Sequence, residues 1–231
     1  MGRFAAIGGG TFEETDPLQK EIVRLSGKAV PNILFIGTAA KDSTNPLTSC
    51  KKSFKRVAPG PVVRKLSILR NQYSEAEVEE LLHWADVIYV CGGDTEFMLE
   101  RWREYGLIPR LRQIFDDDSA VLSGMSAGAI CWFTDGFTDS DFFLGKEDWS
   151  CKLIRPGIDL YPAVFCPHYG AWERKGFDEA VRPLGKKGIA LEDGVGFFYD
   201  NGKEYYLSAV EGHHGYELRV TEEGLQKVVV C

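Results

Sequence analysis

Residues 120–132, AVLSGMSAGAICW, contain the pattern around which the rest of the sequence can be interpreted. An apolar run leads into the glycine-flanked segment GMSAG, and small and apolar residues follow at helical spacing. This order predicts a buried strand, a tight turn with Ser126 at its apex, and a helix. Glycine on either side of the serine permits the close approach of strand and helix that such an elbow needs.

The predicted elbow would place the Ser126 hydroxyl at a helix N-terminus. Free N–H groups and the helix dipole favour a developing negative charge at such an end. We therefore interpret Ser126 as a nucleophile. Turns of small residues also occur purely for packing, so the interpretation depends on partner residues elsewhere in the chain.

Length and composition fit one globular domain that spans residues 1–231. The chain is long enough to bury a large core, and its 44% hydrophobic and 26% charged residues are ordinary values for such a domain. A net charge of −7 without a basic stripe argues against a nucleic-acid partner. The N-terminal apolar run is too short for a signal peptide, and no stretch approaches a membrane span. We expect a cytoplasmic monomer or homodimer without a membrane partner.

The six cysteines are scattered without a C-x-x-C pair, and no residues show metal-ligand spacing. This distribution predicts reduced thiols, no metal site and no cofactor.

Up to residue 132, apolar segments of strand length alternate with segments of helical pattern. Predicted strands occupy residues 4–7, 32–37, 62–69, 87–91 and 120–122. Runs of consecutive apolar residues are typical of a parallel sheet covered on both faces. The sequence therefore predicts an α/β fold with a mostly parallel, twisted sheet and helices on both faces. Reactive groups in such a sheet lie beyond the carboxyl ends of its strands.

The last hundred residues differ in composition from the first part. The acidic, aromatic residues 134–148 predict a long loop at the rim of the active site. Residues 195–199 and 204–210 flank a D-N-G turn and predict an antiparallel hairpin.

A serine nucleophile needs a base, usually a histidine that is itself oriented by a carboxylate. Of the four histidines, His168 follows a predicted strand and Pro167, which places its imidazole at the same sheet edge as Ser126. A structural histidine is the alternative. Glu192 follows another predicted strand, which should end beside that of His168, and is our choice for the carboxylate. Asp193 is also a candidate.

Two further carboxylates, Asp135 and Asp139, follow the elbow and are interpreted as solvated loop residues. An oxyanion hole needs two N–H donors. The residue after the nucleophile, Ala127, supplies one, and the glycine turn at Gly92 and Gly93 is the expected source of the other. An ordinary strand-to-helix turn is the alternative reading of these glycines.

Four motifs, taken together, resemble the peptidase E and cyanophycinase family of serine peptidases. They are Gly92-Gly93-Asp94-Thr95, Gly124-Met125-Ser126-Ala127-Gly128, Cys166-Pro167-His168 and Leu191-Glu192-Asp193-Gly194. The resemblance implies a flavodoxin-like, class I glutamine-amidotransferase-like fold and a Ser126-His168-Glu192 triad. It also implies an oxyanion hole at Gly93 and Ala127, and hydrolysis of a small peptide such as an Asp-X dipeptide.

The sequence departs from the family where Asp94 replaces an asparagine, and the segment after His168 is shorter. Weaker candidates for substrate binding are Gly92, Asp94, Thr95 and Arg174. Arg174 could bind a substrate carboxylate bidentately, although an exposed helical arginine is the alternative.

Two other functions are compatible with parts of the pattern. An α/β-hydrolase esterase would use the chain order Ser, Asp, His and would recruit His213 or His214 with Asp193 or Asp200. A non-catalytic protein could bind a small ligand on the same scaffold, using Asp94 and the aromatic residues 137–143. A true amidotransferase is disfavoured because residue 126 is serine and not cysteine.

Overall fold

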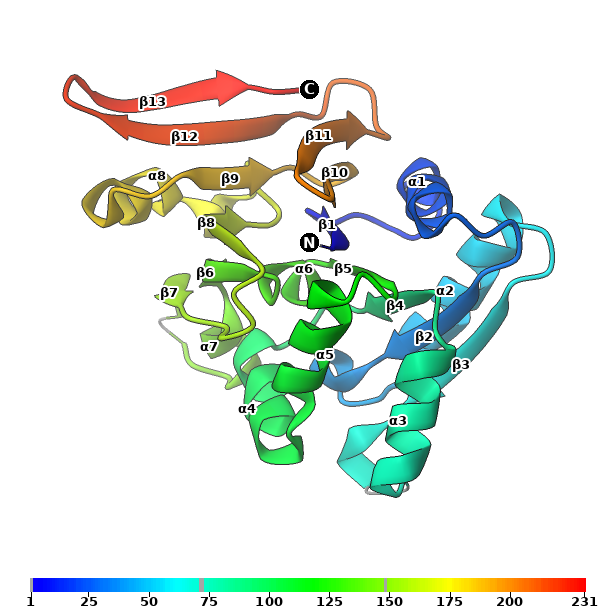
Figure 1. Ribbon diagram of the computed structural model, residues 1–231. Helices are drawn as coiled ribbons and strands as arrows, with labels where there is room; N and C mark the ends of the chain where they lie inside the picture. Colours follow the sequence, from blue (N-terminus) through cyan, green and yellow to red (C-terminus); the bar gives the residue numbers. More distant parts are fainter. Residues whose placement is uncertain (1, 71–72, 148) are drawn as a thin grey trace.

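A computed structural model describes residues 2–70, 73–147 and 149–231 (Figure 1). Two sheets and surrounding helices make up the fold. The larger sheet has the strand order β11-β10-β1-β5-β4-β2-β3. Its strands are β1 Arg3–Ile7, β2 Asn32–Ile36, β3 Val62–Leu66, β4 Val87–Val90, β5 Val121–Met125, β10 Val195–Asp200 and β11 Lys203–Ser208.

Five neighbouring strands of this sheet, from β1 to β3, are parallel, as the apolar runs predict. The other two, β10 and β11, form the predicted hairpin, and β10 pairs antiparallel with β1. The sheet is therefore mixed and not simply parallel. Its centre is the β1-β5-β4 triplet, which ends in the three glycine-rich turns of the sequence.

A second, six-stranded sheet is the main feature that the sequence does not predict. Its order is β13-β12-β9-β8-β6-β7, with parallel pairing only in β6-β8-β9. Its strands are β6 Phe133–Thr138, β7 Lys152–Ile154, β8 Tyr161–Cys166, β9 Gly188–Leu191, β12 Gly215–Thr221 and β13 Gly224–Val229. Figure 1 shows β9, β12 and β13 stacked at the top of the molecule, beyond β8.

The prediction of a long loop over residues 134–148 is wrong for most of its first ten residues. Residues up to Thr138 form β6, and Ser140–Phe143 form the short helix α7. The strand is buried because β8 pairs with it and Ile130 packs against Gly136, and neither contact is encoded locally in its sequence, FTDGFT. Residue 148 lies outside the described residues.

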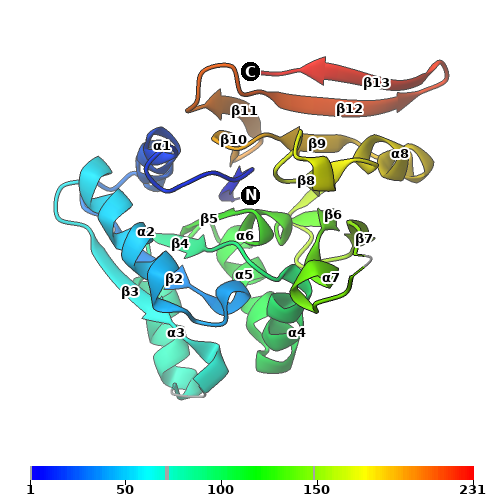
Figure 2. The same cartoon turned by 180° about the vertical axis from the view of Figure 1, so that it is seen from behind.

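Helices cover both faces of the larger sheet, as predicted. The helices are α1 Asp16–Ser26, α2 Thr44–Val57, α3 Glu75–Trp84, α4 Thr95–Tyr105, α5 Leu107–Asp116, α6 Ala127–Ile130, α7 Ser140–Phe143 and α8 Phe177–Val181. Single 3-10 turns occupy Thr38–Ala40, Ile68–Arg70, Trp172–Arg174 and Arg182–Leu184. Helices α2 and α3 lie on opposite faces (Figures 1 and 2). Within the described ranges, no helix has the length and apolar character needed to cross a bilayer.

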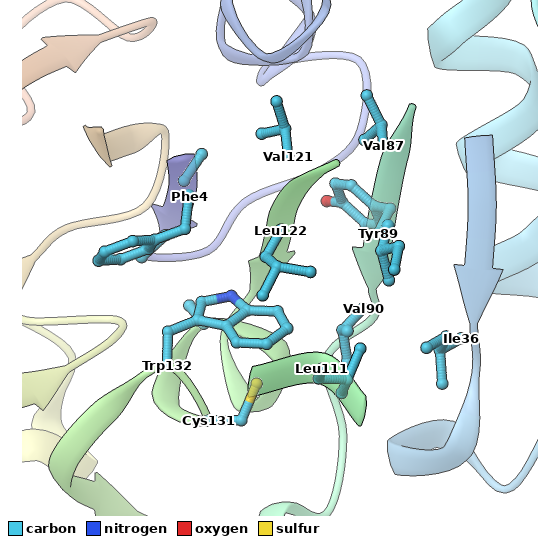
Figure 3. Packing of buried hydrophobic residues seen from close by; sticks show 14 of the residues in the cluster. Phe4, Ile36, Val87, Tyr89, Val90, Leu111, Val121, Leu122, Cys131 and Trp132 are labelled. Atoms are coloured by element: carbon cyan, nitrogen blue, oxygen red, sulfur yellow. The ribbon is translucent and has the colours of Figure 1, made fainter. Parts of the chain in front are cut away.

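Aromatic side chains fill the space between the two sheets. Phe4 of β1 packs edge-on against Phe133 of β6, and Phe133 stacks on Phe165 of β8 with 4.5 Å between the ring centroids. Beneath the elbow, Trp132 is fully buried beside Leu122 (Figure 3). Because apolar burial drives folding, this core holds the end of β5 and the start of β6 in fixed relative positions.

Candidate active site

The segment around Ser126 has the predicted strand-turn-helix geometry. Strand β5 ends at Met125, and α6 begins at Ala127. Ser126 has a φ of 54° and a ψ of −117°, a conformation that a non-glycine residue adopts only under constraint. Gly124 and Gly128 supply that constraint. A Cβ on Gly124 would overlap the Gly128 carbonyl, and one on Gly128 would overlap the carbonyl of Val90 in β4.

His168 reaches Ser126 from the second sheet. It follows β8 and Pro167, and its backbone N–H donates over 3.2 Å to the carbonyl of Gly8, in the turn after β1 of the larger sheet. The imidazole Nε2 lies 2.9 Å from Ser126 Oγ. The structure therefore brings together the hydroxyl and the imidazole that the sequence singles out, although 42 residues separate them.

The carboxylate beside His168 belongs to Asp193. Glu192 is expected at this place from the sequence, and that expectation is wrong by one residue. Asp193 Oδ1 lies 2.6 Å from His168 Nδ1. Glu192 instead accepts hydrogen bonds from the backbone N–H of His214 over 2.9 Å and from the Tyr216 hydroxyl over 3.1 Å. Glu192 directly follows β9 and Asp193 begins the turn after it, so the two side chains leave the backbone in different directions.

The contact with His168 affects the acidity of Asp193. The hydrogen bond to the imidazole lowers the pKa of Asp193 against the opposing effect of partial burial. Asp193 therefore stays ionised and favours the tautomer in which His168 Nδ1 carries the proton. In that tautomer Nε2 accepts a hydrogen bond from the Ser126 hydroxyl, which is the arrangement a general base requires.

The other two candidate carboxylates have structural partners. Asp135 is buried in β6, where it pairs with Lys186 and accepts a bond from the Thr134 hydroxyl. Asp139 forms an ion pair with Arg174 over 3.0 Å. The expectation that Asp135 is a solvated loop residue is therefore wrong, because the residue belongs to a buried strand.

The segments predicted to supply the oxyanion donors lie near the serine, since Ala127 follows it directly and Gly92 packs against it. Gly93 has a φ of 141°, and a Cβ there would overlap the Ala39 carbonyl. A Cβ on the preceding Gly92 would lie 3.2 Å from Ser126 Cβ. Among the described residues, the amides of Gly93 and Ala127 donate to no backbone carbonyl outside the regular helices and strands.

A glycine of the N-terminal turn is part of the site, which the sequence does not reveal. A Cβ on Gly9 would overlap both Asp193 Oδ1 and the ring of His168. The backbone of the turn after β1 thus packs directly against the imidazole-carboxylate pair. The run Gly8-Gly9-Gly10 is a possible signal, but such a run predicts an ordinary turn equally well.

A cavity of about 630 Å³ opens beside His168 and Asp193. Arg174 and Asp139 lie in its wall, together with Glu192. The alternative of an exposed Arg174 is wrong, because the residue is only 3% exposed and donates to the Phe137 carbonyl as well as to Asp139.

Asp94 and Thr95, two weaker candidates for substrate binding, form hydrogen bonds that stabilise the fold. Asp94 is the N-cap of α4 and accepts a bond from the Phe97 N–H over 3.2 Å. The buried Thr95 hydroxyl accepts a bond from Thr138. Neither residue lines the cavity beside His168.

The late histidines do not pair with the serine in the way an esterase of the α/β-hydrolase type requires. His213 Nδ1 lies 2.7 Å from the Asp193 carbonyl oxygen, and His214 Nδ1 lies 2.9 Å from that of Cys231. The chain order of the contacting groups is Ser126, His168, Asp193, whereas α/β-hydrolases place the histidine last.

The site contains a serine at a strained elbow, and its hydroxyl is hydrogen-bonded to a histidine that contacts an aspartate in turn. This is the arrangement of a serine hydrolase. The comparisons with known proteins narrow this class. The model of peptidase family S51 matches residues 4–205, and the chain belongs to this family of serine peptidases. This confirms the resemblance to peptidase E and cyanophycinase.

Relatives match over most of their length. The chain is 30% identical to the uncharacterized peptidase YgaJ of Bacillus subtilis (strain 168), over 99% of this chain and 96% of that protein. A candidate peptidase E from Listeria monocytogenes EGD-e has a solved structure that matches with a TM-score of 0.67 and 18% identity, over 90% of this chain and 98% of that one. The solved structure of a peptidase from an acI-B1 Actinobacterium matches with a TM-score of 0.69 and 19% identity, over 99% of this chain and 94% of that one. These two structures share the fold.

Proposed function

We propose that this S51 peptidase hydrolyses an amide bond in a small peptide through an acyl-enzyme formed on Ser126. The observation that supports this most strongly is the continuous line of contacts from Ser126 Oγ through the imidazole of His168 to Asp193, at 2.9 Å and 2.6 Å. In this proposal Asp193 takes the role that the resemblance gives to Glu192.

The proposed reaction follows from these contacts. His168 Nε2 takes the hydroxyl proton as Ser126 Oγ attacks the carbonyl carbon, and the amides of Gly93 and Ala127 stabilise the oxyanion. His168 then donates the proton to the leaving nitrogen, so that the C–N bond breaks and an ester to Ser126 remains. Water, deprotonated by the same imidazole, hydrolyses that ester. Side chains and backbone amides supply every group in these steps, so the proposal includes no cofactor.

Asp-X dipeptides are the substrates that we propose to test first. A guanidinium has five N–H donors, and its planar fork matches a carboxylate. The buried guanidinium of Arg174 lies in the wall of the cavity beside His168. It bonds to Asp139, to the Phe137 carbonyl and to Cys151 Sγ, and its remaining donors can meet a substrate carboxylate. We further propose that residues 1–231 act as one catalytic unit on an amidotransferase-like scaffold, as a monomer or homodimer.

The test is hydrolysis of a dipeptide panel by the wild type, by Ser126→Ala and by the control Ser119→Ala, whose serine lies on the surface. We expect at least one dipeptide to be cleaved by the wild type and the control and not by Ser126→Ala. Equal cleavage by wild type and Ser126→Ala would refute the nucleophile. Binding of dipeptides without cleavage would favour the alternative of a non-catalytic protein that binds small ligands.

A further inference from the structure

A second cavity adjoins Ser126 and shares no lining residue with the cavity beside His168. Its volume is about 340 Å³. It lies between the turn after β1, the end of β4 and the first turns of α2. We call it the Met125 cavity, and its walls contain Phe12, Pro46, Tyr89, Cys91 and Met125, with Asn45 and Ser49 at the exposed rim.

The Met125 cavity lies within reach of a substrate residue held at the nucleophile. Met125 immediately precedes Ser126, and Gly92 belongs to the cavity wall. A Cβ on Gly92 would lie 3.7 Å from Ser126 Oγ. Gly92 therefore places no side chain between the reactive hydroxyl and this part of the cavity wall.

The two cavities differ in chemical character. Four carboxylates and a buried arginine line the cavity beside His168, whereas no acidic or basic side chain lines the Met125 cavity. The two ionisable groups in its wall stay neutral near pH 7, because burial raises the pKa of Cys91 to about 12 and that of Tyr89 well above its usual value. A charged group placed there would lose hydration without meeting an opposite charge, whereas an apolar group would gain from burial.

Neighbouring residues of an extended peptide point their side chains to opposite sides. A peptide whose scissile bond lies at Ser126 can therefore direct one side chain into each cavity. We propose that the Met125 cavity is the subsite for an uncharged, apolar side chain, and that the adjacent residue across the scissile bond occupies the charged cavity. This inference rests on the proposed peptidase function and adds a second element of specificity to it.

The experiment uses all ordered dipeptides of Asp, Lys, Ser, Leu and Phe, so that it covers both directions of binding. We expect the highest kcat/KM for dipeptides that combine one charged residue with Leu or Phe. Replacement of the apolar residue by Lys should lower kcat/KM about 10-fold or more, the size of effect that an apolar pocket gives.

A matched pair of variants on α2 tests the cavity itself. Ser49→Phe places a bulky side chain at the rim, and Thr48→Phe places the same side chain at the next exposed position, which is not part of the wall. We expect Ser49→Phe to lower kcat/KM about 10-fold for substrates with Leu or Phe and to leave the corresponding Ser dipeptide within about 2-fold. Thr48→Phe should leave the whole panel unchanged.

Wild-type activity without preference for an apolar partner would overturn the inference and leave the proposed peptidase intact. An equal loss in Ser49→Phe on every substrate, with an unchanged melting temperature, would also overturn it. Failure of the wild type to cleave any dipeptide would overturn both proposals.

Discussion

Replacement of Asp193 by asparagine is the substitution that examines the candidate triad in most detail. Asparagine keeps the size of the side chain but can present an NH₂ group to His168 Nδ1, which lies 2.6 Å from the present carboxylate oxygen. That contact would favour the tautomer with the proton on Nε2. The imidazole could then no longer accept the proton of the Ser126 hydroxyl.

A wrong tautomer and the loss of the negative charge act on the same step. Together they are expected to lower kcat about 10⁴-fold, or about 5.5 kcal/mol of transition-state stabilisation. The matched control is Glu192→Gln. The wild-type Glu192 carboxylate accepts hydrogen bonds from His214 and Tyr216 and does not pair with the His168 imidazole. We therefore expect the kcat of Glu192→Gln to lie within about 10-fold of wild type.

The assay is steady-state hydrolysis of the best dipeptide, with thermal melting to confirm that both variants are folded. Asp193 is half exposed, so the substitution should leave the fold intact. Near-normal turnover in Asp193→Asn together with a 10⁴-fold loss in Glu192→Gln would refute the reasoning and would return the role to Glu192.

Three further predictions follow from the packing and the charges. Gly9→Ala should lower kcat about 100-fold in the dipeptide assay, because the new methyl group must displace His168 or Asp193, and wild-type turnover would refute that contact. Trp132→Ala should lower the free energy of unfolding by about 3–5 kcal/mol in denaturant titrations, whereas a loss below about 1 kcal/mol would show that the fully buried indole packs poorly. The pKa of Asp193 is lowered in the folded state, so its stabilising effect is complete above the ordinary aspartate value of about 3.9 and is lost as the pH falls through the lowered value. Wild type should therefore lose more stability than Asp193→Asn as the pH falls below about 4, and parallel curves would contradict this.

The sequence predicts those parts of the site that depend on local pattern and on strand ends. Ser126 is recognisable because its flanking glycines are needed for the elbow itself. His168 is recognisable because it follows a buried strand and therefore lies at the reactive edge of a sheet. The choice between Glu192 and Asp193 depends on the direction of one side chain just past β9, which the sequence does not determine.

Other features depend on contacts between distant segments. Arg174 looks like a surface residue in sequence, and it is buried because Asp139, 35 residues earlier, supplies the opposite charge. Strand β6 contains a threonine, an aspartate and a glycine in succession, and its strand character depends on β8. The same holds for Gly9, whose close packing against His168 requires both sheets to be in place.

The most direct measurement of the central claim is covalent labelling with a fluorophosphonate, followed by peptide mapping. An activated serine attacks the phosphorus and displaces fluoride, so the account predicts one modified residue, Ser126, no modification in Ser126→Ala, and much slower modification in His168→Ala. A wild-type protein that remains unmodified, or one labelled at the same rate after loss of the imidazole, would contradict the account.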